Sequence, residues 1–188
     1  MGNCVEKQLN ARRGVFLDRD GVITVSLETE GKGYAPRSLV EFKFYDGTRE
    51  SIERIRKLGF LPIVVSNQPD VANGLLSLSV LEQMNQRIRD DLGIAEINNC
   101  PHNSMDNCSC RKPRPGMILS SAEKWSIDLA QSWMIGDRDS DVVAGATAGC
   151  KTIFIDRNWK AETGEYADFR CDSLLAAVDL ISEQTDSY

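Results

Sequence analysis

Short apolar runs and longer segments with helical spacing alternate along most of the chain. The short runs have the length and composition of strands buried on both faces of a sheet, and they lie at 15–17, 60–65, 94–97, 133–135 and 152–155. Predicted helices lie at 47–58, 76–92, 142–148 and 173–181, with one more after Pro115. Strands that alternate with helices predict an α/β fold, in which helices cover both faces of a central parallel sheet.

The composition indicates one globular domain, and the net charge argues against nucleic acid as a partner. The chain has 188 residues, of which 41% are hydrophobic and 27% charged, as in ordinary soluble proteins. We expect a single domain over 1–188 and a monomer. The net charge of −6 argues against a nucleic-acid partner, because phosphate backbones are bound by basic surfaces. No apolar run is long enough for a membrane helix, and the first 20 residues lack the apolar core of a signal peptide, so we expect a cytoplasmic protein.

Polar side chains follow three of the predicted strands at the point where each strand ends. They are Asp18 and Asp20, then Ser66 and Asn67, then Asp137 and Asp141. Because parallel strands bring their carboxyl ends to the same edge of a sheet, these groups can converge there. Carboxylates crowded into one pocket favour a hard cation such as Mg²⁺. The local sequence alone leaves two simpler roles open, since the Asp18–Asp20 pair also suits an acidic surface loop and Asp137 also suits a helix cap.

The segment from 24 to 36 shows no clear periodicity. It contains two glutamates and the run Gly31-Lys32-Gly33-Tyr34, which is typical of a loop. Two interpretations remain open for it: a solvated connection, or a small lid over Asp18.

Four potential metal ligands lie together in the second half of the chain. They are Cys100, His102, Cys108 and Cys110, with turn-forming residues between them. Three thiolates and one imidazole match a closed tetrahedral Zn²⁺ site, which leaves no position for water and therefore predicts a structural metal. Unpaired thiols are the competing interpretation. The other cysteines, Cys4, Cys150 and Cys171, are expected to be ordinary packing or tail residues.

A basic pair, Arg111-Lys112, follows directly after this cluster. Such pairs are usually solvated surface features, but a metal-bound loop would hold this one in a fixed direction. Lysine neutralises a phosphoryl group as a point charge, and arginine grips oxygens with two parallel bonds. We therefore expect Arg111 and Lys112 to bind a phosphate.

Together these motifs resemble the haloacid dehalogenase superfamily of phosphohydrolases. Four motifs are matched in order, at 16–23, 66–68, Lys112 and 136–141, and the match spans residues 14 to 156. The cysteine loop and the run 111–117 resemble the branch that contains D,D-heptose 1,7-bisphosphate phosphatase and histidinol-phosphate phosphatase. The resemblance implies a three-layer Rossmann-like fold with a central parallel sheet, a zinc-binding loop at 100–110 and no large cap domain.

The resemblance also implies a division of labour among the site residues. Asp18 would be the nucleophile that forms an aspartyl-phosphate, and Asp20 would protonate the leaving oxygen and then activate water. Mg²⁺ would be held by Asp18, by the backbone carbonyl of Asp20 and by Asp137, with Asp141 nearby. The remaining implied roles are phosphoryl binding by Ser66 and Lys112, and contact with the rest of the substrate by Asn67 and Arg111.

The implied activity is a Mg²⁺-dependent phosphatase of a small sugar phosphate. The first expectation is D-glycero-D-manno-heptose 1,7-bisphosphate, with removal of the C7 phosphate, and histidinol phosphate is the rival substrate. The run 69–74 departs from the usual continuation of the second motif, which leaves the substrate open. Two further functions stay open: a catalytically silent zinc-bearing module that binds a partner, and a phosphoryl transferase that uses the same aspartyl-phosphate.

Overall fold

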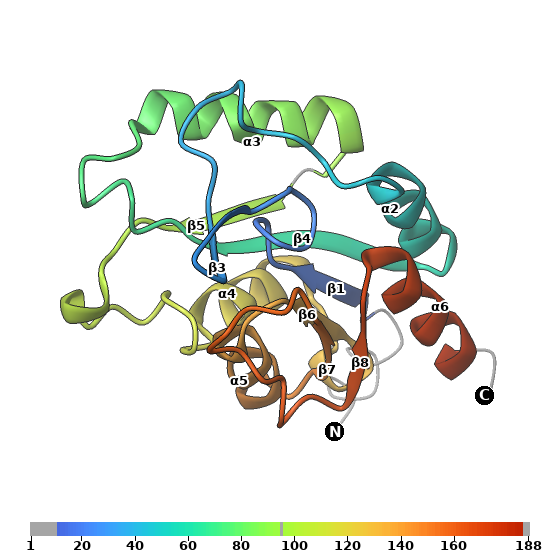
Figure 1. The fold of residues 1–188 in the computed structure, drawn as a ribbon. Coiled ribbons are helices and arrows are strands. Elements are labelled where there is room, and N and C mark those ends of the chain that lie inside the picture. Colours follow the sequence, from blue (N-terminus) through green and yellow to red (C-terminus); the bar gives the residue numbers. More distant parts are fainter. Residues whose placement is uncertain (1–10, 95, 186–188) are drawn as a thin grey trace.

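The computed structural model describes residues 11–94 and 96–185, so that Cys4 lies outside the described residues. Parallel strands form one sheet in the order β5-β4-β1-β6-β7-β8 (Figure 1), which confirms the predicted fold class. The strands are β1 (Arg13–Leu17), β4 (Phe60–Asn67), β5 (Glu96–Cys100), β6 (Trp133–Gly136), β7 (Lys151–Ile155) and β8 (Phe169–Cys171). Strand β1 lies in the interior, between β4 and β6, so the residues that follow it emerge between two neighbouring strand ends.

Helices cover both faces of the sheet. On one face lie α2 (Thr48–Lys57), α3 (Leu78–Leu92) and α6 (Leu174–Thr185), and on the other α4 (Gly116–Trp125) and α5 (Asp139–Ala148). Side chains alternate along β1, so Val15 and Leu17 join the core under the first group of helices and Phe16 joins the core under the second. Short 3₁₀ turns, η1 (Ser104–Asp106) and η2 (Leu129–Gln131), lie in the connections.

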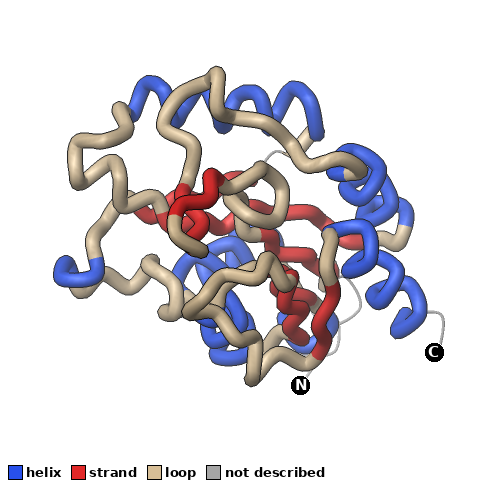
Figure 2. Tube along the Cα trace, viewed as in Figure 1, coloured by secondary structure: helices blue, strands red, loops and turns tan. Residues whose placement is uncertain are grey.

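A small hairpin occupies the segment for which the sequence predicts only a loop or a lid. Strands β2 (Leu27–Thr29) and β3 (Lys32–Tyr34) pair in antiparallel fashion, and they turn at Glu30 and Gly31, which both have positive φ (Figure 2). The residues of β2 are exposed, so no alternation of apolar and polar positions marks the strand in the sequence.

Three further elements differ from the prediction. The strand expected over 94–97 runs over Glu96–Cys100, where Asn98 donates a hydrogen bond to Ser121 of α4 instead of supplying an apolar side chain. Strand β8 is an edge strand of only three residues, which is too short for a strand pattern to show in the sequence, although Phe169 and Cys171 pack against the core. Helix α5 begins at Asp139, before the apolar residues that predict it. Within the described residues, no helix is long and apolar enough to cross a membrane.

Candidate active site

The carboxyl ends of β1, β4 and β6 bring the predicted polar residues to one edge of the sheet. Asp18 follows β1 directly, and its backbone N–H donates to the carbonyl of Ile135 on β6 over 2.9 Å. Gly21 then turns the chain with φ of 97° and lies against the Asp137 carboxylate, where any side chain would collide. Gly136 lies against Asp141 in the same way. Glycine at position 21 therefore lets the ends of β1 and β6 approach one another, and glycine at position 136 leaves room for the Asp141 side chain.

Three buried carboxylates converge at this edge. Ligand oxygens of Asp18, Asp137 and Asp141 all lie within 4.8 Å of one another. Burial raises the pKa of Asp18 to about 6, although the ammonium group of Lys112 opposes this, and burial together with the charges of Asp18 and Asp141 raises the pKa of Asp137 well above its usual range. Asp137 Oδ1 is buried and has no hydrogen-bond partner within the described chain. A cluster of buried carboxylates with one unpartnered oxygen fits a hard divalent cation.

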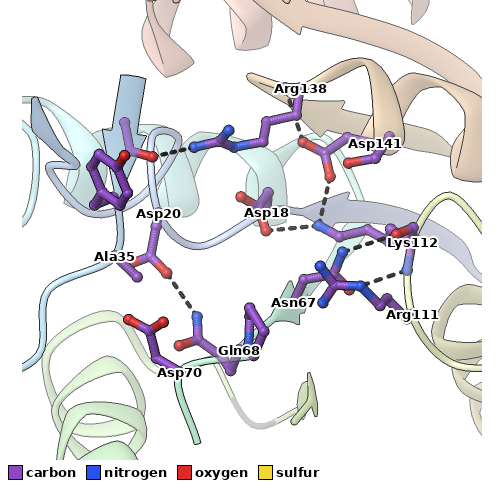
Figure 3. Close-up of a pocket in the computed structure, with 14 residues that line it drawn as sticks. Asp18, Asp20, Ala35, Asn67, Gln68, Asp70, Arg111, Lys112, Arg138 and Asp141 are labelled. Atoms are coloured by element: carbon purple, nitrogen blue, oxygen red, sulfur yellow. Dashed lines mark hydrogen bonds and ion pairs between the residues drawn. The ribbon is translucent and has the colours of Figure 1, made fainter. Parts of the chain in front are cut away.

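Lys112 reaches into the same cluster from the segment after the cysteine loop (Figure 3). Its Nζ lies 2.7 Å from Asp18 Oδ1 and 2.6 Å from Asp141 Oδ1. It also donates to the carbonyl of Val65 over 2.7 Å. Burial lowers the pKa of this lysine, but the neighbouring charges of Asp141 and Asp18 raise it by a larger amount. The net shift of the pKa is therefore upward. Lys112 is therefore a fixed positive charge beside the candidate nucleophile.

The two residues predicted to contact the substrate beyond its phosphate both form hydrogen bonds that hold the Lys112 segment. Asn67 donates from Nδ2 to the carbonyl of Lys112 over 3.0 Å and accepts from its backbone N–H at Oδ1 over 3.1 Å. Arg111 donates from Nη1 to the carbonyl of His102 over 3.0 Å. Both residues also line the pocket, so contact with a substrate remains open to them.

Asp20 lies beside Asp18 with a different set of partners. Its carboxylate accepts from the buried Arg19 guanidinium, from the hydroxyl of Thr24 over 2.8 Å, and from Gln68 Nε2 over 2.7 Å. Gln68 also donates to the hydroxyl of the buried Ser66 over 2.9 Å. The site predicted from the sequence does not include Arg19 or Gln68, although both lie inside the matched motifs at 16–23 and 66–68.

A cavity of about 300 Å³ opens above these groups. Its floor holds the predicted residues Asp18, Asp20, Asn67, Arg111, Lys112 and Asp141, and its rim includes Gly33, Tyr34 and Ala35 at the end of the hairpin. Residues 33–35 at the end of the segment 24–36 thus line the pocket, and the lid and the solvated connection both stay predictions for this segment. The run 69–74 also reaches the pocket, where Asp70 accepts from Arg37 over 2.7 Å.

The predicted metal ligands of the cysteine loop also come together. Cys110 Sγ lies 3.2 Å from Cys100 Sγ, 3.4 Å from Cys108 Sγ and 3.3 Å from His102 Nδ1. In a tetrahedral zinc site with bonds of about 2.3 Å, sulfur atoms are about 3.8 Å apart. The four groups therefore have the chemistry and nearly the spacing of a metal site. Cys150 is buried in the core and Cys171 is half-buried, which agrees with their expected packing role.

A loop after β7 adds residues that the sequence does not single out. Trp159 donates from Nε1 to Asp137 Oδ2 over 2.6 Å, and Arg157 donates to the carbonyl of Gly21 over 2.7 Å. Arg138, which follows Asp137, donates to the carbonyl of Gly33 in the hairpin. These contacts depend on tertiary structure, and no local pattern in the sequence predicts them.

The chain is similar to known proteins over nearly its whole length. The HAD-hydrolase-like family model matches residues 109–177. The D-glycero-beta-D-manno-heptose-1,7-bisphosphate 7-phosphatase of Helicobacter pylori is 35% identical over 181 residues, covering 92% of this chain and 99% of its own. The protein of the same name from Escherichia coli K12 is 34% identical and covers 90% of this chain and 94% of its own.

A solved structure supports the same assignment. The crystal structure of D,D-heptose 1,7-bisphosphate phosphatase from B. bronchiseptica, complexed with magnesium and phosphate, matches with a TM-score of 0.79 at 27% identity. It covers 92% of this chain and 99% of its own. The resemblance carried by the four motifs is thereby confirmed. The chain belongs to the HAD-like hydrolases, in the family of the D-glycero-D-manno-heptose 1,7-bisphosphate 7-phosphatases.

Proposed function

We propose that this protein is a Mg²⁺-dependent phosphatase that removes the C7 phosphate of D-glycero-D-manno-heptose 1,7-bisphosphate through an aspartyl-phosphate. The observation that carries the proposal is the buried Asp18 carboxylate at the floor of the pocket, held 2.7 Å from Lys112 Nζ and beside Asp137 and Asp141. The names of the similar proteins from H. pylori and E. coli support the substrate.

The reaction follows from the two carboxylates at the end of β1. An Asp18 oxygen attacks the phosphorus, and the bond from phosphorus to the C7 oxygen breaks as Asp20 gives that oxygen a proton. Asp20 then takes a proton from water, whose oxygen attacks the phosphorus, and the bond to Asp18 breaks. Lys112 neutralises charge on the phosphoryl oxygens as it develops, and the Ser66 hydroxyl is the proposed second contact.

Two metal sites complete the proposal. Asp18, Asp137 and the backbone carbonyl of Asp20 would hold Mg²⁺, whose charge offsets that of the carboxylates and of the phosphate. Cys100, His102, Cys108 and Cys110 would hold a structural Zn²⁺. Zn²⁺ bound there would fix the loop from which Arg111 and Lys112 enter the pocket. A monomer in the cytoplasm, without nucleic-acid or membrane partners, remains our prediction.

Histidinol phosphate remains the rival substrate. The rival function is that of a catalytically silent zinc-bearing module that binds a partner. The silent module gives no reason for a cluster of three buried carboxylates and a buried lysine beside a cavity, where each charge is costly to desolvate.

A substrate panel tests the proposal. It contains both anomers of heptose 1,7-bisphosphate and histidinol phosphate, assayed with Mg²⁺ and scored by kcat/KM, because that ratio measures discrimination. We expect a heptose bisphosphate to be preferred and an Asp18→Asn protein to be inactive. A preference for histidinol phosphate would show that this compound, and not the heptose bisphosphate, is the substrate. Hydrolysis of none of the compounds by folded, zinc-loaded protein would favour the silent module, and full activity of Asp18→Asn would refute the mechanism.

A further inference from the structure

The indole of Trp159 holds one oxygen of the proposed Mg²⁺ ligand Asp137. Its Nε1 donates to Asp137 Oδ2 over 2.6 Å, while Oδ1 is buried and has no partner within the described chain. A carboxylate that is fixed at one oxygen can rotate little, so its other oxygen keeps one orientation. Groups that hydrogen-bond a metal ligand in this way set its orientation and tune metal affinity.

The same indole lies against the hairpin at the pocket rim. A Cβ added to Gly33 would lie 2.7 Å from Cζ2 and 2.8 Å from Cε2 of Trp159, so the ring packs directly on the backbone there. Next to it, the backbone N–H of Lys160 donates to the carbonyl of Gly31 over 3.0 Å. Three residues after the indole, Glu162 accepts from the backbone N–H of Asp139 over 2.7 Å. The loop after β7 thus joins the hairpin to the strand end that carries Asp137.

We propose that Trp159 is a positioning residue that orients Asp137 for Mg²⁺ and couples the position of the β2–β3 hairpin to metal affinity. The inference rests on the proposed function, because it takes Asp137 to be a Mg²⁺ ligand. A hairpin that moves at Gly33 must move the indole, and an indole that moves releases Asp137 Oδ2. Substrate that orders the hairpin would therefore tighten Mg²⁺ binding, and Mg²⁺ would tighten substrate binding equally.

Calorimetric titration of the zinc-loaded protein with Mg²⁺, without substrate, tests the positioning role. Trp159→Phe keeps an aromatic ring but removes the N–H donor, and we expect its Mg²⁺ Kd to rise by about 10-fold or more. Trp125→Phe is the matched control, because Trp125 lies on α4 and its buried N–H has no partner within the described residues. A Trp159→Phe protein that is folded and binds Mg²⁺ as tightly as the wild type would overturn the proposal.

Tryptophan emission gives a second readout that does not depend on activity. The chain has three tryptophans, and we expect Mg²⁺ to change the emission of the wild type and of Trp125→Phe, but not of Trp159→Phe. A change of wild-type size that persists in Trp159→Phe would place the reporter elsewhere and count against the proposal.

Gly33→Ala tests the coupling with Trp159 still present. The added methyl group must displace the indole, so we expect the Mg²⁺ Kd to rise several-fold, and the two substitutions together to weaken binding by less than the product of their separate effects. If Gly33→Ala raised the KM for heptose bisphosphate and left the Mg²⁺ Kd unchanged, the position of the hairpin would be independent of the metal site. Because Mg²⁺ is titrated without substrate, a protein that meets these expectations but hydrolyses no heptose bisphosphate would refute the proposed function alone.

Discussion

The side-chain amide of Asn67 forms two hydrogen bonds with the backbone of Lys112, one as donor and one as acceptor. The sequence resemblance assigns Asn67 to the substrate beyond its phosphate, but the observed pairing fastens the end of β4 to the segment that carries the lysine. The two roles make different predictions.

For Asn67→Ala we expect kcat to fall by about 10²-fold, because a small displacement of Lys112 misaligns the phosphoryl contact. The fall should be the same for heptose bisphosphate and for p-nitrophenyl phosphate, which shares only the phosphate. Asn98→Ala is the control, since that amide bonds Ser121 away from the pocket. A loss confined to the heptose substrate would restore the role of Asn67 in binding the sugar.

Asp20→Asn should separate proton transfer from metal binding. The proposed metal contact of Asp20 is through its backbone, and its carboxylate is occupied by Arg19, Thr24 and Gln68. We expect kcat to fall by about 10²- to 10⁴-fold while the Mg²⁺ Kd, measured by calorimetry, stays within a few-fold of the wild type. Abolished Mg²⁺ binding would contradict this assignment.

Asp137→Asn should stabilise the metal-free protein and destroy its response to Mg²⁺. Burial raises the pKa of Asp137 in the folded protein well above the unfolded value of 3.8, so the folded state binds more protons and loses stability as pH rises above that value. In EDTA the Tm advantage of Asp137→Asn should therefore be absent near pH 4 and grow towards pH 7.

Addition of Mg²⁺ should reverse the order of the Tm values of the wild type and Asp137→Asn. A ligand that binds only the folded state raises its stability with concentration, so the wild type should gain Tm and Asp137→Asn should not. Equal gains in both proteins would remove Asp137 from the metal site.

Cys108→Ser tests whether the cysteine loop aims the catalytic lysine. We expect bound zinc, measured by elemental analysis, to fall, and kcat to fall by about 10-fold or more as Arg111 and Lys112 lose their fixed loop. Cys171→Ser is the matched control, because its sulfur bonds a backbone carbonyl outside the cluster. Loss of zinc with unchanged kcat would make the metal irrelevant to the position of Lys112.

The parts of the fold and site that the sequence predicts are those with local signals. The run before Asp18 is apolar because β1 is buried on both faces, and the acidic residues mark the strand end in the sequence itself. The four ligands of the cysteine loop lie within one short segment, so their meeting requires no knowledge of the fold. The convergence of Asp18 and Asp137 follows once the strands are taken as parallel, and Lys112 joins them from the segment after the cysteine loop.

The parts that the sequence does not predict depend on tertiary contacts. Exposed strand β2 pairs with β3 without any apolar alternation. The end of β3 lies at the pocket rim, and Gly31 and Gly33 of the hairpin contact the distant loop around Trp159. Gln68 is an ordinary amide until the fold places it between Asp20 and Ser66. Nothing near these residues in the chain signals such partners.

The distance along the chain between Asp18 and Lys112 bears on how the protein acquires its activity. The two residues meet across 94 positions, through parallel strands that must pair by closing long loops, which is a slow class of folding event. In refolding experiments helical content should return early, and turnover should return only with the last long-range pairing. Recovered activity therefore times the final step of assembly, and a chain cut between β5 and α4 should regain turnover only when both pieces are mixed.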